Sequence, residues 1–364
     1  MSTKNKTIWS IVVLVVVVVM VSYALKSNTP AQAQVIKVGA ILPLTGDSAS
    51  LGESGKNALE LAMADLKGTK YQYQIIYEDI GNFDSSLTAS AMNKLANIDN
   101  VNAVITLSSG TGNVIAPIAN NDKVIQFSCA SDLHIAQGEY NFLDVTPPSE
   151  ETKLLVAELE KKGYKRLGLF YTNQQGMLAM MDETRKQIQG TDIQIVADQK
   201  VDPGTTDFRS MILMAQQAKP DIYILNLLSP GLENLAKQMK ELKITTPVTA
   251  VEAFEYTDQM NLFEGDWYVQ QADALPWFTA EYQSEYGKVY KVCAPNFYDS
   301  FNLLAAAYEK AGQNASQDNV VNQLLQIQNY NGALGTVSIG ADHIAASKAA
   351  LRMIKDGQPV TIGK

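Results

Sequence analysis

Short apolar segments alternate with longer segments of helical periodicity along most of the chain. Residues 36–42 suit a strand buried on both faces, 46–54 form a turn-rich loop, and apolar positions recur at helical spacing over 56–66. The same unit recurs at 73–77 and 86–98, 101–107 and 113–120, 124–128, 166–171 and 177–189, 193–197 and 208–218, and 221–227 and 232–242. This alternation predicts an α/β fold with parallel sheets flanked by helices.

The length of the chain and its breaks in pattern predict two lobes. The chain has 364 residues, and single cores stop growing near about 250–300 residues. Pro147 and Pro148 interrupt the pattern first, it loosens again over 263–276, and a turn follows at 331–335. If the chain crosses from one lobe to the other at each of these breaks, lobe 1 consists of 34–147 plus about 272–331, and lobe 2 of 148–271 plus about 332–364. We expect a ligand cleft between the two lobes.

The N-terminal residues 1–33 indicate export. Residues 8–25 carry no charge and follow Lys4 and Lys6, and Ala31-Gln32-Ala33 fits a cleavage site. An uncleaved membrane anchor is the alternative, because 18 apolar residues are long enough to span a bilayer as a helix. In both cases the flanking lysines place the folded part outside, in the periplasm or an equivalent extracytoplasmic space.

Charge and metal-ligating residues exclude several classes of partner. The net charge is −9, and it falls to −12 without residues 1–33, which carry three lysines and no acid. Nucleic acid is therefore an unfavourable partner. Cys129, Cys293, His134 and His343 have no metal-site spacing, so we expect no metal. The cysteines either pair after export or serve as buried apolar residues, and the sequence favours the second interpretation.

Two strand ends carry candidate ligand-binding groups. Ser108, Ser109 and Gly110 follow an apolar strand and open a helix, where hydroxyl and backbone N–H groups can hold an anion. Plain helix capping is the alternative for these residues. Glu252 follows the apolar run 247–251 and could meet a ligand ammonium, the alternative being a surface acid.

Sequence fingerprints of cofactors and catalysis are missing. The run 110–115 begins with Gly-Thr-Gly, but Ile115 stands where the dinucleotide-binding fingerprint needs its third glycine. The sequence also contains neither a phosphate-binding loop nor a nucleophile elbow. Adjacent acids such as Glu150 and Glu151 are expected on a solvated face. We therefore expect no cofactor and no enzymatic activity.

Several stretches resemble one family. Residues 35–46, Ser108-Ser109-Gly110 with Ala116-Pro117-Ile118-Ala119, 221–240 and 295–312 are similar to the leucine/isoleucine/valine-binding family of extracytoplasmic solute-binding proteins of ABC transporters. The resemblance covers residues 35 to about 340. It implies the type I periplasmic-binding fold, which has two Rossmann-like lobes, three crossings and a ligand cleft.

The resemblance also implies a binding site. By this resemblance, Ser108, Ser109 and Gly110 bind the carboxylate of the ligand, and Glu252 of the second lobe binds its ammonium group. Further contacts follow from the strand end at Ala130, Ser131 and Asp132, where the family often has threonine in place of the aspartate. Positions that are often aromatic in the family are here Leu51, Gln175 and either Leu228 or Ser229. We therefore expect a pocket without aromatic walls, and a polar ligand or one other than leucine.

The resemblance implies a monomer that closes over a small zwitterion, such as an amino acid, and delivers it to a membrane permease. A membrane-tethered sensing module of the same fold is the alternative. A two-lobed α/β enzyme is a third hypothesis, and no motif supports it.

Overall fold

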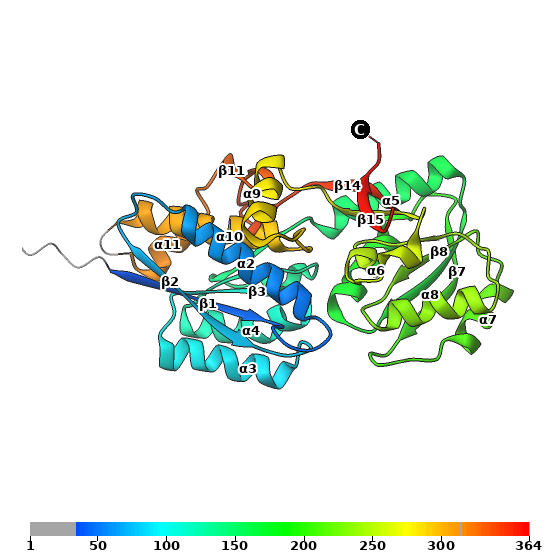
Figure 1. Ribbon diagram of the computed structural model, residues 1–364, viewed down its shortest axis with the longest axis horizontal. Coiled ribbons are helices and arrows are strands. Elements are labelled where there is room, and N and C mark those ends of the chain that lie inside the picture. Colours follow the sequence, from blue (N-terminus) through cyan, green and yellow to red (C-terminus); the bar gives the residue numbers. More distant parts are fainter. Residues whose placement is uncertain (1–33, 313–314, 364) are drawn as a thin grey trace, which may run out of the picture.

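In the computed structural model of the protein, the described residues are 34–312 and 315–363, and they form two α/β lobes that lie side by side (Figure 1). Parallel sheets flanked by helices confirm the predicted fold class. The expected signal peptide or anchor, residues 1–33, lies outside the described residues. Within the described part of the chain, no helix is both long and apolar enough to cross a membrane.

Lobe 1 is built on a six-stranded sheet whose pairings are all parallel, in the order β13-β5-β4-β3-β1-β2. Every residue of β3, β4 and β5 is buried, because helices cover both faces. The strands are β1 (Val35–Leu42), β2 (Gln72–Asp79), β3 (Ala103–Leu107), β4 (Ile125–Cys129), β5 (Asn141–Val145) and β13 (Ile344–Ala346).

Two helical layers enclose this sheet. One apolar core joins α2, α10 and α11 to one face, and a second core joins α3 and α4 to the other. The helices are α2 (Ala49–Asp65), α3 (Ser85–Lys94), α4 (Ser109–Asp122), α9 (Pro276–Tyr286), α10 (Ala294–Ala311) and α11 (Gln317–Leu324).

Lobe 2 combines a parallel and an antiparallel sheet. The parallel sheet has the order β7-β6-β8-β9, and the antiparallel one has the order β10-β14-β15. The strands are β6 (Arg166–Thr172), β7 (Gln194–Val201), β8 (Ile222–Asn226), β9 (Val248–Thr249), β10 (Trp267–Gln271), β14 (Ala349–Lys355) and β15 (Gln358–Thr361). Separate apolar cores lie under α5 (Pro148–Lys162) with α6 (Gln175–Gln187), and under α7 (Arg209–Gln217) with α8 (Gly231–Glu241).

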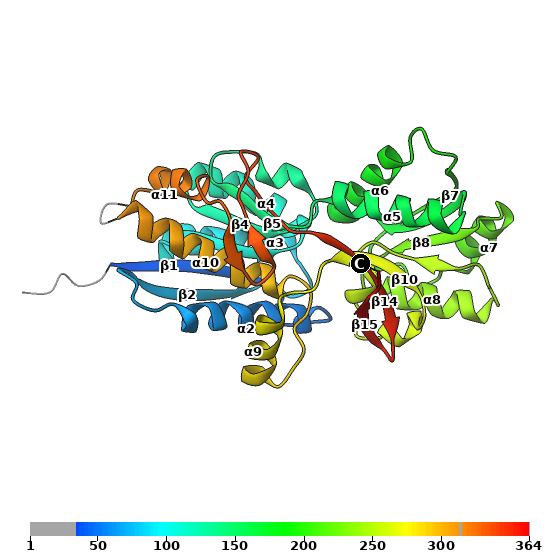
Figure 2. The same cartoon turned by 90° about the horizontal axis from the view of Figure 1, so that it is seen from above.

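The third crossing between the lobes lies later than the sequence predicts. The turn at 331–335 joins the hairpin strands β11 (Tyr330–Gly332) and β12 (Gly335–Val337), and β13 then pairs with β5 of lobe 1. The chain enters lobe 2 only at 347–348, where β14 begins to pair with β10 (Figure 2). The assignment of 332–346 to lobe 2 is therefore wrong, because a hairpin turn has the same glycine signal as a linker.

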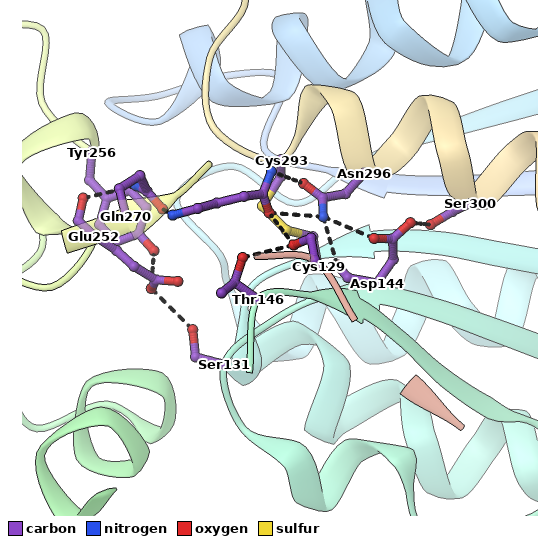
Figure 3. Close-up of a disulfide and its surroundings, with 12 residues drawn as sticks. Cys129, Ser131, Asp144, Thr146, Glu252, Tyr256, Gln270, Cys293, Asn296 and Ser300 are labelled. Atoms are coloured by element: carbon purple, nitrogen blue, oxygen red, sulfur yellow. Dashed lines mark hydrogen bonds between the residues drawn. A yellow bond between two sulfur atoms is a disulfide. The ribbon is translucent and has the colours of Figure 1, made fainter. Parts of the chain in front are cut away.

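Polar side chains tie the three crossing segments together (Figure 3). Thr146 of the first crossing lies 2.7 Å from the hydroxyl of Ser347 in the third, and Ser347 donates to Gln271 of the second at 3.3 Å. Gln271 exchanges hydrogen bonds of 3.1 Å with Asn296 of α10, and Asn296 also donates to Asp144 of β5 at 3.0 Å. These bonds hold the three connecting segments against lobe 1.

A disulfide joins Cys129 at the end of β4 to Cys293 at the start of α10. The bond corrects the interpretation of both cysteines as buried apolar residues. The first segment of lobe 2, residues 148–271, lies between the two cysteines, which are 164 positions apart in sequence. The disulfide therefore closes a loop that contains most of lobe 2.

Replacing both cysteines by alanine should lower the free energy of unfolding by about 2–4 kcal/mol, because the unfolded chain loses a constraint on a long loop. Urea unfolding followed by circular dichroism measures the change. Reductant should lower the wild-type midpoint and leave that of the double variant unchanged. A wild-type midpoint insensitive to reductant would contradict this role.

Candidate ligand-binding site

A cavity of about 440 Å³ lies between the lobes, at the carboxyl ends of strands from both parallel sheets. Nine of the ten predicted site residues line it: Leu51, Ser108, Ser109, Gly110, Ala130, Ser131, Gln175, Leu228 and Glu252. This position agrees with the general placement of ligands in open parallel sheets.

The first residues of α4 offer backbone donors to the cavity. The Ser108 hydroxyl accepts from the backbone N–H of Thr111 at 3.2 Å, so this side chain caps the helix. The Ser109 hydroxyl accepts from the backbone N–H of Asp132 at 3.1 Å. The N–H groups of Ser109 and Gly110 donate to no acceptor among the described residues, so they are available to an anion at the positive end of the helix.

A second helix begins opposite α4, across the cleft. The first residues of α6, Gln175 and Gly176, line the cavity, and the side chain of Gln174 caps the backbone N–H of Gly176 at 3.0 Å. A Cβ atom at position 176 would lie 2.8 Å from the Ser109 hydroxyl oxygen. The lobes therefore approach closely here, and two helix N-termini face one cavity.

Glu252 supplies the acidic wall from lobe 2. Its backbone has φ 64°, which turns the chain sharply beyond β9. One oxygen, Oε2, accepts from the Tyr256 hydroxyl at 2.6 Å and, across the cleft, from the Ser131 hydroxyl at 3.1 Å (Figure 3). Burial raises the pKa of Glu252, and the hydrogen bonds from Tyr256 and Ser131 oppose this rise.

Glu151 of α5 lies close to Glu252, and the sequence-based site did not include it. Its side chain is fully buried, and neither carboxyl oxygen has a hydrogen-bond partner among the described residues. Burial, and then the charge of Glu252, raise the pKa of Glu151 well above its usual range. The expectation that Glu150 and Glu151 share a solvated face holds only for Glu150, because Glu151 lies one turn before the buried Leu155.

Asp132, which the resemblance places among the residues that contact the ligand, does not line the cavity. Its carboxylate accepts from Asn113 at 2.8 Å and from the backbone N–H of His134 at 3.1 Å. The His134 ring nitrogen also lies 2.8 Å from it. These contacts turn the carboxylate toward its own lobe and hold its pKa below the usual value despite burial.

Aromatic and apolar groups absent from the sequence-based site also reach the cavity. Phe83, Phe208 and Tyr256 line it, so the expectation of a pocket without aromatic walls is wrong. The disulfide between Cys129 and Cys293 forms part of the same wall. Sequence spacing gave no signal for these residues, because they come from loops that only the tertiary fold brings together.

The charged residues of the lining are all acidic. They are Asp47, Asp202 and Glu252, and no lysine, arginine or histidine is among the described residues of the wall. Asp47 and Asp202 are exposed, whereas Glu252 is buried. A cavity of this charge lacks a side-chain cation for an anionic ligand, and it has a buried acid for a cationic group.

A cavity at the carboxyl ends of two parallel sheets, between lobes joined by three crossings, defines a ligand-binding protein of the type I periplasmic-binding architecture. A family model described as periplasmic binding protein matches residues 35–359, and the chain belongs to this family. The match confirms the resemblance to leucine/isoleucine/valine-binding proteins found in the sequence.

Solved structures share the fold. The leucine binding protein LivK from Thermotoga maritima is 20% identical and has a TM-score of 0.83, over 90% of this chain and 98% of that one. LivJ from Streptococcus pneumoniae, in complex with isoleucine, is 19% identical with a TM-score of 0.79, over 90% and 99%. An ABC-transporter solute-binding protein from Rhodopseudomonas palustris, in complex with 3,4-dihydroxybenzoic acid, is 20% identical with a TM-score of 0.80, over 90% and 96%. No curated protein matches the chain in sequence.

Gly176→Ala should weaken ligand binding about tenfold, because the new methyl group would push α6 away from Ser109 and oppose closure. Gly231→Ala is the matched control, since it also lies in the cavity wall at a helix start and its Cβ would have ordinary 3.7 Å contacts. Calorimetric titration measures both affinities. Equal affinity in the two variants would show that the lobes need no close contact at Gly176.

Proposed function

We propose that the protein is the extracytoplasmic solute-binding component of an ABC transporter, and that it closes around a small zwitterion such as an amino acid. The proposal rests on two features that line the same cavity. The backbone N–H groups of Ser109 and Gly110 have no acceptor among the described residues, and the acid Glu252 is buried. The first can hold a carboxylate and the second an ammonium. Delivery to a membrane permease follows from the family's role.

The charge of the cavity favours a zwitterion over a simple organic acid. The relative from Rhodopseudomonas palustris was solved with 3,4-dihydroxybenzoic acid, which has a carboxylate and no ammonium. In this chain such a ligand would leave Glu252 buried without a cation, at a cost in desolvation. An amino acid supplies both charges and pairs with both lobes, so its binding favours the closed form.

Glu252→Gln should weaken amino-acid binding by about 2–5 kcal/mol, because the buried ammonium loses its charged partner. Ser109→Ala should cost less, about 1.5–3 kcal/mol, since it removes one hydrogen-bonding group near the carboxylate. A thermal-shift screen of the standard amino acids and of benzoate identifies the probe, and calorimetry then compares the variants.

Glu160→Gln is the matched control for these variants, because Glu160 is an exposed acid of the same lobe with no side-chain partner among the described residues. It should bind as wild type does. Unchanged affinity in Glu252→Gln would remove Glu252 from the site, and stabilisation by benzoate alone would contradict a zwitterionic ligand.

A tethered sensing module is the second candidate, and the apolar run 8–25 favours it. For the transport component we expect a chain that begins at Gln34 after cleavage behind Ala33. Intact mass and membrane fractionation of the native protein test this expectation. A full-length chain retained in the membrane fraction would contradict cleavage and favour the tethered form.

The proposal also includes an absence of catalytic turnover, which follows from the missing nucleophile and cofactor motifs. A bound amino acid should be recovered chemically unchanged after long incubation. Steady conversion of any tightly bound ligand would contradict a purely binding role.

A further inference from the structure

Glu151 is a buried acid without a donor. It lies in the first turn of α5, its side chain has no exposed surface, and its two carboxyl oxygens accept no hydrogen bond from the described residues. An ionised carboxylate in this position would lose its hydration and gain no partner, which is among the most costly states for a buried group. The side chain therefore needs a proton or a cation.

Among residues 34–312 and 315–363, no cation pairs with Glu151. Glu252 lies beside it and raises its pKa, and Tyr256 uses its hydroxyl to donate to Glu252. Arg352 lies on β14, which packs against α5. Its guanidinium donates to a carboxyl oxygen of Glu255 at 2.8 Å. A second acid, Asp273, also accepts from Arg352, and Tyr268 donates to Glu255 at 2.7 Å. Two carboxylates therefore already pair with the terminal nitrogens of this guanidinium, and its Nε donates to no acceptor among the described residues.

Hydrogen bonding distinguishes the two acids of the pair. Glu252 accepts from Ser131 and Tyr256, and both bonds favour its ionised form. Glu151 has no such bonds among the described residues. The single proton of the pair is therefore best placed on Glu151, where it can bond to Glu252.

We propose, resting on the proposed function, that Glu151 is a positioning residue: it keeps the proton of a buried carboxyl pair and uses that O–H group to donate a hydrogen bond to Glu252. The pair then presents one negative charge to the cavity. That charge matches a ligand with one ammonium group, and the hydrogen bond orients the carboxylate that receives it. Glu151 thereby sets the charge of the ammonium subsite without touching the ligand.

Infrared spectroscopy of the ligand-free protein at neutral pH tests the position of the proton. Asp144 and Asp299 form another pair of buried acids, so the carbonyl band of protonated carboxyls is read as a difference between wild type and each variant. Glu151→Gln should remove one protonated carboxyl from the spectrum, and Glu252→Gln should remove none. Loss in Glu252→Gln with no loss in Glu151→Gln would overturn the assignment.

The pH dependence of folding gives a second ligand-free readout. In the unfolded chain the Glu151 side chain loses its proton around its ordinary pKa of about 4.3. In the folded protein its raised pKa means that it keeps the proton at higher pH. This group therefore lowers wild-type stability as the pH rises above that value. The Glu151→Gln variant lacks this pH-dependent loss of stability. Its urea midpoint should therefore rise relative to that of the wild type as the pH increases from 5 to 8. A constant difference would contradict a protonated Glu151.

Affinity for the tightest-binding standard amino acid tests the positioning role. Glu151→Gln keeps a neutral donor and should bind within about twofold of wild type, whereas Glu151→Ala should bind about 10- to 150-fold more weakly, as expected for loss of a hydrogen bond to a charged group. Glu150→Gln, an exposed neighbour, is the control and should bind as wild type does. Equal loss in the Gln and Ala variants would overturn the role. If no amino acid binds, the proposed function fails, and the infrared result still decides the proton's position.

Discussion

The carboxylate of Glu252 is buried at the meeting point of the two lobes, with hydroxyl donors and no side-chain cation in the described wall of the cavity. This electrostatic imbalance explains the arrangement around it. Ser131 reaches it from lobe 1, Tyr256 from lobe 2, and Glu151 lies behind it. Hydroxyl donors reduce the cost of the buried charge, and an ammonium ion in the cavity would remove most of the remainder. A ligand that carries one would then stabilise the contact between the lobes.

The connections between the lobes are held together near the same cavity. The crossing segments are bonded to one another through Thr146, Gln271 and Ser347, and Asn296 anchors them to lobe 1. The disulfide fixes the start of α10 to the end of β4, close to the same anchor. At the rim, Lys291 of lobe 1 pairs with Asp258 of lobe 2 at 2.6 Å. Asp258 is exposed to solvent, so this pair contributes little by itself.

Local sequence signals were sufficient for the architecture, and together with the family resemblance they named nine residues that line the cavity. Apolar runs followed by helical periodicity predicted the parallel sheets, and strand-end positions predicted Ser108–Gly110 and Glu252 as wall residues. The third crossing was misplaced because a hairpin and a linker share the same glycine-rich signal. Asp132 was misassigned because its orientation depends on Asn113 and His134.

Sequence patterns could not show which residues that lie far apart in the chain are buried against one another. The disulfide joins residues 164 positions apart, and no local pattern encodes such proximity. Glu151 has a signal in retrospect, because it is one helical turn from Leu155 and shares that buried face. Because Glu150 is the adjacent residue, the two acids together have the pattern of a solvated surface, and burial of Glu151 was not predicted.

Native mass spectrometry of the protein purified from its host without refolding is the most direct measurement of what the cavity holds. A cavity with a buried acid and no basic side chain in its described wall should retain a small molecule that contains an amine together with a carboxylate. Recovery of an organic acid without any cationic group, bound in one-to-one ratio, would contradict the pairing of Glu252 with a ligand ammonium.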